Sequence, residues 1–260
     1  MSRTDRLTYA ALHELIARYE GYDDGSLTRY EHRVFSQNGE DGVIAEILRR
    51  IGCANRWFVE FGAETGAEAN CVTLADVAGW SGLFMEAGED RSNELRRKYR
   101  AYRKITAQRS FVTVDNIEEL FAAAGAPNDL DVLSIDVDGN DFWLWRALTN
   151  YRPRLVVIEY NADFDPRRSF VQDYDPERMW DGTVHYGASL GALEWLAETK
   201  GYRLVHTELS GNNAFFVPVE FAAEFPGEVP RRGPNFWLTG DSHPPHPPAP
   251  PRYLEVPGDL

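Results

Sequence analysis

A glycine-rich segment with acidic neighbours is the first part of the chain whose residue types and spacing could do chemistry. It covers residues 60–66, with the sequence EFGAETG, and includes the end of a short apolar run. Glycines where a strand turns into a helix allow backbone conformations that a Cβ would forbid, and they let the backbone approach a ligand closely. The start of the following helix would offer free N–H groups and the positive end of its dipole. The segment predicts a small-molecule site, with a plain strand–helix turn as the alternative interpretation.

The spacing of the glycines separates two classes of cofactor. Dinucleotide-binding turns have the pattern GxGxxG, with the pyrophosphate on the helix start, whereas Gly62 and Gly66 give GxxxG. Glu64 lies between them, where a carboxylate would repel a pyrophosphate but could pair with an amine. The pattern therefore favours a cofactor that carries an amine over a dinucleotide.

A carboxylate and two apolar residues follow at positions where such a cofactor would place its ribose and its base. Glu86 ends the second apolar run, about 20 residues or slightly more after the loop, where an acidic side chain accepts both ribose hydroxyls. Phe111 and Val112 come after the third run. They are candidates for the wall that packs on an adenine, and a place in the core is the alternative interpretation.

Acidic and amide side chains after the fourth and fifth apolar runs indicate a cation site. Asp136, Asp138 and Asp141 follow the fourth run, and Glu159 and Asn161 end or follow the fifth. Carboxylates at one sheet edge repel one another, so a cation or a proton transfer explains them better than folding alone. Asp136, Glu159 and Asn161 form a set of hard oxygen ligands that suits Mg²⁺ or Mn²⁺. The alternative is a metal-free site in which Asp136 positions the substrate or the amino-acid part of the cofactor.

The long segment 161–189 comes directly after the fifth apolar run. Loops of this length in a compact domain tend to be lids or binding loops. Of the six histidines, His185 is best placed near the cleft, where its near-neutral pKa would suit a general base. A hydrogen-bonded structural histidine is the alternative. Trp180, Phe164 and Phe170 either form an apolar wall for a substrate or pack the loop.

The elements that must position these groups alternate between short apolar strands and helices. Strands buried on both faces read as nearly unbroken apolar runs, and helices between them imply right-handed crossovers in a parallel sheet. The last two strands are separated by the turn-like residues 210–213, which predicts an antiparallel hairpin. The fold class is therefore Rossmann-like α/β, with helices on both faces of the sheet. The expected strands are 57–61, 82–86, 103–108, 131–136, 154–160, 202–207 and 214–218. The expected helices are 4–20, 39–51, 67–79, 90–100, 116–125, 141–149 and 192–200.

Four segments together resemble the FkbM-type branch of class I S-adenosylmethionine-dependent methyltransferases. They read FSQNGED, VEFGAETG, LSIDVDGND and LVVIEYN, and the later pair GYRLV and NNAFFV fits the closing hairpin of the same family. The resemblance implies a seven-stranded sheet with strand order 3-2-1-4-5-7-6. It also implies methyl transfer, mostly to hydroxyls of sugars and natural products. One departure is DVDGND after the fourth strand, where the common family pattern is DxEGxE.

The resemblance also implies roles for single residues. Glu60, Gly62 and Gly66 would line the methionine part of the cofactor, and Asp136 would lie on the reacting side. The segment 36–41 would cover the cofactor pocket. Metal-dependent O-methyltransferases place carboxylate and amide ligands at the ends of strands four and five, which is similar to the set proposed above. Together with the residue pattern, this gives the following cofactor-binding candidates: Gln37, Asn38, Glu60, Gly62, Ala63, Glu64, Gly66, Glu86, Phe111, Val112 and Asp136.

The overall composition excludes several other partners. A net charge of −14, from 27 Lys+Arg and 41 Asp+Glu, argues against nucleic acid or an anionic membrane, because binding a polyanion needs a basic face. Two cysteines provide no disulfide framework. The N-terminus lacks the apolar core of a signal peptide, and no apolar run is long enough to span a membrane. We expect a cytoplasmic enzyme that acts on a small molecule, with a homo-oligomer allowed.

The expected organisation is an N-terminal helical extension (1–34), a methyltransferase domain (35–239) and a Pro-rich tail (240–260) that stays outside the core. The leading hypothesis is an O-methyltransferase in which His185 assists deprotonation of a hydroxyl. Two alternatives stay open at this point. A nicotinamide-dependent oxidoreductase conflicts with the glycine spacing and the final hairpin. A non-catalytic module that docks an SH3-like partner through its tail would not need so many acidic groups at strand ends.

Overall fold

The computed structural model describes residue 15 and residues 26–235, 243–246 and 252–258. The helix expected over 4–20 lies outside these residues, apart from Leu15. The division of the chain at residues 34 and 239 stays a prediction. Within the described ranges, none of the helices has the length and apolar character that crossing a membrane requires.

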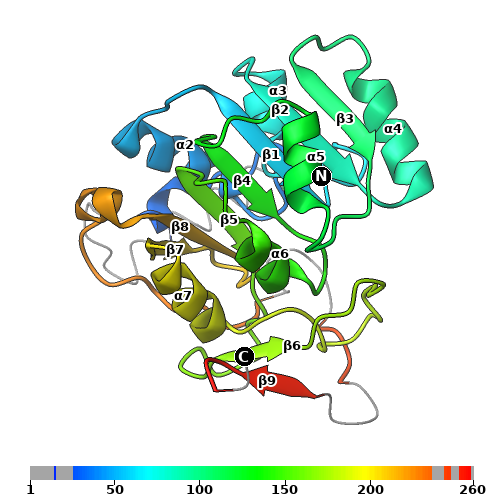
Figure 1. Cartoon of the computed structure of the whole chain (residues 1–260). Coiled ribbons are helices and arrows are strands. Elements are labelled where there is room, and N and C mark those ends of the chain that lie inside the picture. The colour runs from blue at the N-terminus through cyan, green and yellow to red at the C-terminus, as the bar shows by residue number, and fades with distance from the viewer. Residues whose placement is uncertain (1–14, 16–25, 236–242, 247–251, 259–260) are drawn as a thin grey trace.

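A seven-stranded sheet forms the centre of the molecule (Figure 1). Its strand order is β3-β2-β1-β4-β5-β8-β7, and β8 alone runs opposite to the other strands, antiparallel to both β5 and β7. Counted along the chain within this sheet, the order is the expected 3-2-1-4-5-7-6, so the predicted Rossmann-like topology is confirmed. The strands are β1 (Trp57–Phe61), β2 (Ser81–Glu86), β3 (Ile105–Arg109), β4 (Val132–Ile135), β5 (Leu155–Glu159), β7 (Tyr202–Thr207) and β8 (Asn213–Pro218).

Two apolar layers hold helices against the two faces of the sheet. Side chains of successive strand residues point to opposite faces. In β1, Val59 and Phe61 pack into the layer with α5, α6 and α7, which lie on the near side in Figure 1. Phe58 packs into the opposite layer with α2, α3 and α4. The helices are α2 (Glu40–Ile51), α3 (Val72–Asp76), α4 (Glu89–Tyr99), α5 (Ile117–Ala123), α6 (Asp141–Ala147) and α7 (Leu190–Thr199), with short 3-10 turns η1 (Thr28–Tyr30) and η2 (Val219–Glu224).

The helix expected over 67–79 is wrong in its extent. The observed helix is α3 alone, because residues 62–71 form a loop that is hydrogen-bonded to Glu60. The two carboxylate oxygens of Glu60 accept hydrogen bonds from the backbone amides of Asn70 and Cys71, both at 2.8 Å. These bonds fix the two residues that directly precede α3, which begins at Val72.

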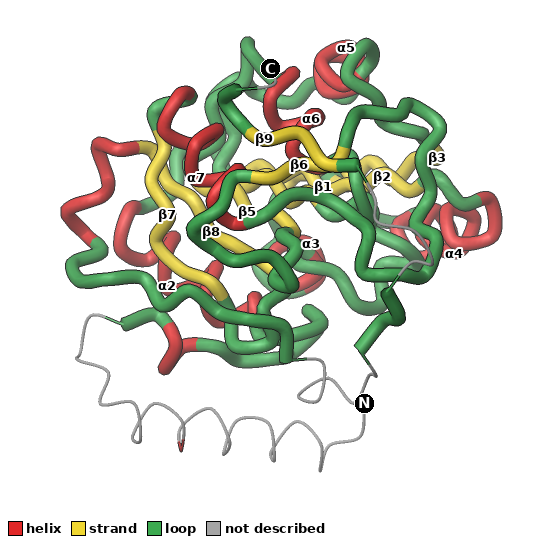
Figure 2. Tube along the Cα trace, turned by 90° about the horizontal axis from the view of Figure 1, so that it is seen from below, coloured by secondary structure: helices red, strands yellow, loops and turns green. Residues whose placement is uncertain are grey.

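A second, two-stranded sheet was not expected from the sequence. It pairs β6 (Phe170–Gln172) with β9 (Tyr253–Glu255) in antiparallel fashion, and both views show the two strands side by side (Figures 1 and 2). Val256 follows β9 and is only 4% exposed within the apolar layer. The expectation that the Pro-rich tail stays outside the core is therefore wrong for residues 252–258, because alternating apolar residues there supply a strand.

The hairpin turn between β7 and β8 is organised by a buried carboxylate. Glu208 accepts hydrogen bonds from the backbone amides of Ser210 at 2.6 Å, Asn213 at 2.9 Å and Asn212. These amides would otherwise be unsatisfied in a buried turn, which is costly. The arrangement fixes the turn beside the carboxyl end of β5, where Asn212 reaches the cavity described below.

Candidate active site

A cavity of about 370 Å³ lies at the carboxyl ends of the parallel strands. In open α/β sheets, ligands bind at this edge, where strand ends and loops meet. The cavity is lined by the ends of β1, β2 and β5 and by the segments directly after β3 and β4. The lining residues named from the sequence are Gln37, Gly62, Glu64, Glu86, Phe111, Val112, Asp136, Asp138, Glu159 and Trp180.

The glycine turn brings two strand ends together. Gly62 has a φ of +78°, and a Cβ at this position would lie 1.6 Å from the carbonyl oxygen of Asp136. Gly66 also has a positive φ, and a Cβ there would meet Leu95 at 2.7 Å. The glycines therefore serve the close packing of β1, β4 and α4. Ala63 and Gly66 are not among the lining residues.

Glu60 is buried and is not among the residues that line the cavity. It is 3% exposed, and besides the two amides it accepts a hydrogen bond from the Ser134 hydroxyl at 3.2 Å. Burial raises the pKa of Glu60 to about 7, although these three hydrogen bonds act in the opposite direction. The sequence expectation that Glu60 lines the cofactor is replaced by a structural role. Its carboxylate is already used to hold the start of α3.

Glu86 is the carboxylate that faces the cavity at the end of β2. It is 6% exposed, one oxygen accepts from the backbone amide of Glu64 at 3.0 Å, and the other accepts from that of Gly88 at 2.7 Å. These bonds fix the orientation of the carboxylate and tie the glycine turn to β2. Each carboxylate oxygen retains a further lone pair, so Glu86 can still accept hydrogen bonds from a ligand.

The segment 36–41 lies beside the cavity, but its two predicted residues have different surroundings. Gln37 lines the cavity, whereas Asn38 is 2% exposed and is not a lining residue. The segment is shaped by Asp41, whose carboxylate accepts from the backbone amides of Phe35 and Ser36, each at 2.7 Å. Gln37 is thus the side chain of this segment that a ligand in the cavity can meet.

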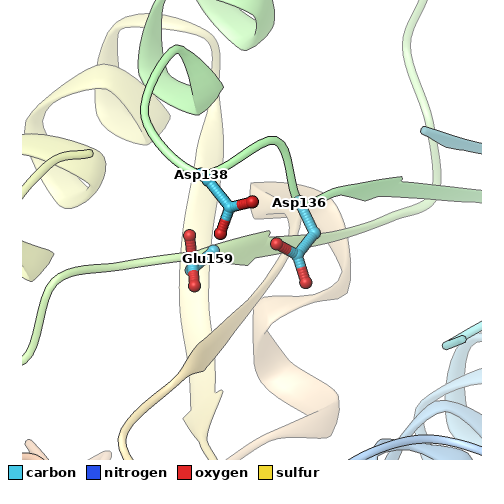
Figure 3. Close-up of side chains that lie close together, drawn as sticks. All are labelled: Asp136, Asp138 and Glu159. Carbon is cyan, nitrogen blue, oxygen red and sulfur yellow. The ribbon is translucent and has the colours of Figure 1, made fainter. Parts of the chain in front are cut away.

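Three carboxylates meet where β4 and β5 end. Oxygen atoms of Asp136, Asp138 and Glu159 lie within 4.8 Å of one another, and Figure 3 shows the three side chains gathered around one point. The backbone of Asp138 is in the left-handed region, with φ +55°. Asp141 holds this loop by accepting from the backbone amides of Val137 and Gly139, both at 2.9 Å.

Asn161, the third predicted metal ligand, is not among the residues that line the cavity. Its side-chain amide donates to the backbone carbonyls of Val184 at 2.8 Å and Tyr186 at 2.9 Å. Its side-chain oxygen accepts from the amide of Asp163 at 3.0 Å. Asn161 thus fastens the long loop to the body, and Asp138 takes the third place beside Asp136 and Glu159.

Burial and nearby carboxylates raise the pKa of all three side chains. Burial, followed by the charge of Asp138, raises the pKa of Asp136 well above its ordinary value. Burial and then Asp136 do the same for Glu159. The pKa of Asp138 is also raised, by burial and by the charge of Glu64. Such a group favours either a bound cation or a proton.

His185 does not line the cavity, which departs from its predicted place as a general base. Its ring lies 5.1 Å from that of Tyr253, measured between centroids, in the layer beneath β9 and β6. Burial, and then the charge of Arg178, lower its pKa. Nε2 has no hydrogen-bond partner among the described residues. Because β9 was not expected, the sequence offered no sign that a tail residue packs on this ring.

Several lining residues were not assigned to the site from the sequence. Asp138 and Asn140 belong to the same DVDGN run as Asp136. The polar character of this run is the sequence feature that indicates their place at the site. Arg178 and Met179 come from the long loop, and Trp180 from the same loop was singled out only as a candidate wall. Met179 and Trp180 are 72% and 47% exposed. Their place at the cavity depends on the conformation of the long loop after β5, which the sequence pattern does not indicate.

Comparison with known proteins gives fold likenesses only. No family model and no curated protein matches the chain. Among solved structures, the N-terminal domain of EvdMO1 in the presence of SAH and D-fucose is 14% identical, covering 80% of this chain and 94% of that chain, with a TM-score of 0.43. A putative O-methyltransferase from Klebsiella pneumoniae is 16% identical (82% and 99% covered, TM-score 0.44). The O-methyltransferase from Bacillus cereus in complex with SAH is 14% identical (80% and 96% covered, TM-score 0.46). At these values the likeness does not establish a function for this chain.

Proposed function

We propose that the chain is an S-adenosylmethionine-dependent O-methyltransferase whose cofactor occupies the cavity at the carboxyl ends of the strands. The observation that carries this proposal is the buried, oriented carboxylate of Glu86 at the end of β2. A carboxylate at this place in a Rossmann-like sheet accepts the two ribose hydroxyls of a nucleoside cofactor. The resemblance of four sequence segments to the FkbM-type branch supports the same assignment.

The neighbouring strand supplies a surface for the adenine. Glu86 pairs in register with Arg109 of β3, so Phe111 lies just beyond the end of that strand, beside Glu86. Phe111 is 41% exposed and lines the cavity together with Val112 and Ser110. An exposed aromatic ring next to a ribose-binding carboxylate is the surface on which an adenine would pack.

The same geometry disfavours a dinucleotide. A pyrophosphate normally sits on free amides at the start of the first crossover helix. Here the amides of Asn70 and Cys71 are already bonded to the carboxylate of Glu60. The loop also places the carboxylates of Glu64 and Glu68 in the cavity wall, where they would repel phosphate. An S-adenosyl cofactor has no phosphate and carries a positively charged sulfonium and ammonium group.

The reaction itself needs little covalent help from the protein. The acceptor oxygen attacks the methyl carbon, the carbon–sulfur bond breaks, and S-adenosylhomocysteine leaves with the electron pair on sulfur. The hydroxyl proton must go to a base. The protein's main contribution is to hold the oxygen, methyl carbon and sulfur in line and near contact distance. Asp136 and Glu159 line the same cavity as Glu86.

The three strand-end carboxylates fit a hard divalent cation such as Mg²⁺ or Mn²⁺. All three offer oxygen atoms, and Oε2 of Glu159, a residue 8% exposed, has no hydrogen-bond partner among the described residues. When bound there, such a cation would lower the pKa of an acceptor hydroxyl. Asp136, Asp138 and Glu159 would hold it, and Asn161 would not.

Asp136 is also the base that the chain itself can offer if no cation takes part. Its raised pKa makes it a stronger proton acceptor than an ordinary aspartate. Treating the protein with EDTA separates the two arrangements. Loss of activity that Mn²⁺ restores supports the cation, whereas full activity of metal-free protein assigns the proton to Asp136. We propose a hydroxyl of a sugar or a natural product as the acceptor class, on the sequence resemblance.

Calorimetry on the full chain tests the proposed cofactor. We expect S-adenosylhomocysteine to bind with one site per chain and NAD to give no heat of binding. Binding of NAD, or of neither compound, would contradict the proposal. The same preparation, supplied with S-adenosylmethionine carrying a labelled methyl group, provides the protein for the acceptor experiments below.

A further inference from the structure

The cavity has an excess of negative charge. Six carboxylates line it: Glu64, Glu68, Glu86, Asp136, Asp138 and Glu159. Two guanidinium groups, those of Arg91 and Arg178, are the opposing charges among its described lining residues. The formal excess is therefore four negative charges in a space of about 370 Å³. Charges in a cleft with low-dielectric walls act strongly on a ligand that enters it.

Both guanidinium groups already have acidic partners. Arg91 lies 3.2 Å from the carboxylate of Glu64. Arg178 lies 3.2 Å from the carboxylate of Asp173 and also donates to its backbone carbonyl at 2.9 Å. An anionic ligand in the cavity would therefore find both guanidinium groups already beside a carboxylate.

The proposed cofactor and cation would neutralise only part of this charge. S-adenosylmethionine carries one net positive charge, and a divalent cation carries two. One negative charge remains from the formal excess of four with both bound. An acceptor with a carboxylate or phosphate would therefore meet repulsion, whereas a protonated amine would be attracted.

An exposed tryptophan lies at the same cavity. The indole N–H of Trp180 donates to the carbonyl of Thr183 at 2.7 Å, which holds the side chain in the loop while the ring stays 47% exposed. In the described part of the chain, no aromatic ring stacks on it. A Cβ at Gly139 would lie 2.9 Å from Cδ of Arg178, so this part of the loop packs directly on the Asp138 turn. An indole face attracts cations and packs on sugar rings.

Unpaired oxygen atoms give a second, independent indication. Asn140 is 5% exposed and lines the cavity; its amide group donates to the carbonyl of Asp175 at 2.8 Å, but its Oδ1 has no partner. Oε2 of Glu159 also lacks one. Among the described lining residues, the only other buried side-chain atom without a partner is Nε of Arg178. Buried oxygens without a donor indicate a ligand that brings N–H or O–H groups.

We propose, on the basis of the proposed function, that the acceptor is a hydroxylated compound that carries a protonated amine, such as an amino sugar. Its ammonium group lies between the face of Trp180 and the carboxylates of the Asp138 turn. Asn140 accepts a hydrogen bond from its amine or hydroxyl groups. The charge of the cavity excludes acceptors that carry a carboxylate or a phosphate.

Three matched hexoses test this assignment: D-glucosamine, D-glucose and D-glucuronate. Their binding to the full chain saturated with S-adenosylhomocysteine is measured by saturation-transfer NMR. We expect glucosamine to bind about tenfold more tightly than glucose, with glucuronate unbound. The preference should shrink as ionic strength rises. W180A should lose most of the preference and W180F should retain part of it. Y102A, which removes an exposed ring that does not line the cavity, should leave it unchanged.

The outcomes separate this inference from the proposed function. Calorimetry with S-adenosylhomocysteine precedes the hexose titrations for every variant. If S-adenosylhomocysteine does not bind to the wild-type chain, the proposed function fails. If it binds but glucuronate binds as well as glucosamine, or no hexose binds, the amine-bearing acceptor is wrong while the cofactor assignment stands. Equal glucosamine preference in W180A and the wild type would remove Trp180 from the acceptor site.

Discussion

Replacing Glu60 with glutamine separates a structural role for this residue from a role in binding a cofactor. In the structure, the carboxylate of Glu60 accepts three hydrogen bonds, two of them from the amides that start α3. It is nonetheless so deeply buried that its pKa is raised from 4.5 to about 7. Glutamine has nearly the same shape and keeps one accepting oxygen, but it does not titrate.

The magnitude follows from the shift in pKa. One pKa unit corresponds to about 1.36 kcal/mol, so a rise from 4.5 to about 7 corresponds to roughly 3 kcal/mol. The native state holds this proton more tightly than the unfolded chain. The resulting stabilisation is therefore complete below about pH 4.5 and is lost as the pH rises through about 7. The glutamine variant lacks this dependence.

Urea unfolding of both proteins at a series of pH values between 5 and 8 measures the effect. The difference in unfolding free energy, wild type minus E60Q, should fall by roughly 2–3 kcal/mol as the pH rises across this range. Because other titrating groups are common to both proteins, they cancel in this difference. E94Q, at an exposed position of α4, is the control and should show no such trend. A difference that stays constant, or rises with pH, would mean that the amides hold the carboxylate ionised and would refute the reasoning.

Three further predictions concern the same edge of the sheet. G62A should lower the unfolding free energy by about 2 kcal/mol or more, because its Cβ would collide with the carbonyl of Asp136; an unchanged urea midpoint would contradict this. D138N should weaken Mn²⁺ binding, measured by calorimetry, by about tenfold or more, while D115N, at an exposed position, should not; equal affinities would remove Asp138 from the cation site. H185Q should reduce kcat far less than the roughly 10²–10⁴-fold expected on loss of a general base and should keep the pH–rate profile. A large loss with a missing acidic limb would restore His185 as the base.

The strands could be predicted from the sequence because parallel strands buried on both faces leave an unmistakable apolar run. All residues of β4 and β5 are buried. Ser210 and Gly211 predicted the hairpin turn because these residue types favour turns. The extent of α3 could not be predicted. The residue types of 67–71 are compatible with a helix. Only the hydrogen bonds that Glu60 accepts from the amides of Asn70 and Cys71 show that the helix starts later.

For the site, the sequence located carboxylates at strand ends but not the direction of each side chain. Asp136, Glu159 and Glu86 follow from the rule that ligands bind at the carboxyl edge of the sheet. The partners of Asn161, the carbonyls of Val184 and Tyr186, could not be predicted because they lie more than twenty residues away in the chain. His185 was misplaced for a similar reason, since β9 covers it from the far end of the chain.

The affinity of S-adenosylhomocysteine for E86Q tests the central claim most directly. Glu86 would lose its charge and one of the acceptors that face the ribose, which is worth about 1.5–3 kcal/mol, or roughly 10–100-fold in Kd. E89Q is the matched control, because Glu89 begins α4 nearby and pairs with Arg109 on the surface. Calorimetry should show a 10- to 100-fold weaker Kd for E86Q and about the wild-type Kd for E89Q, and circular dichroism should show both variants folded. Equal affinity of E86Q and the wild type would contradict the placement of the cofactor in this cavity.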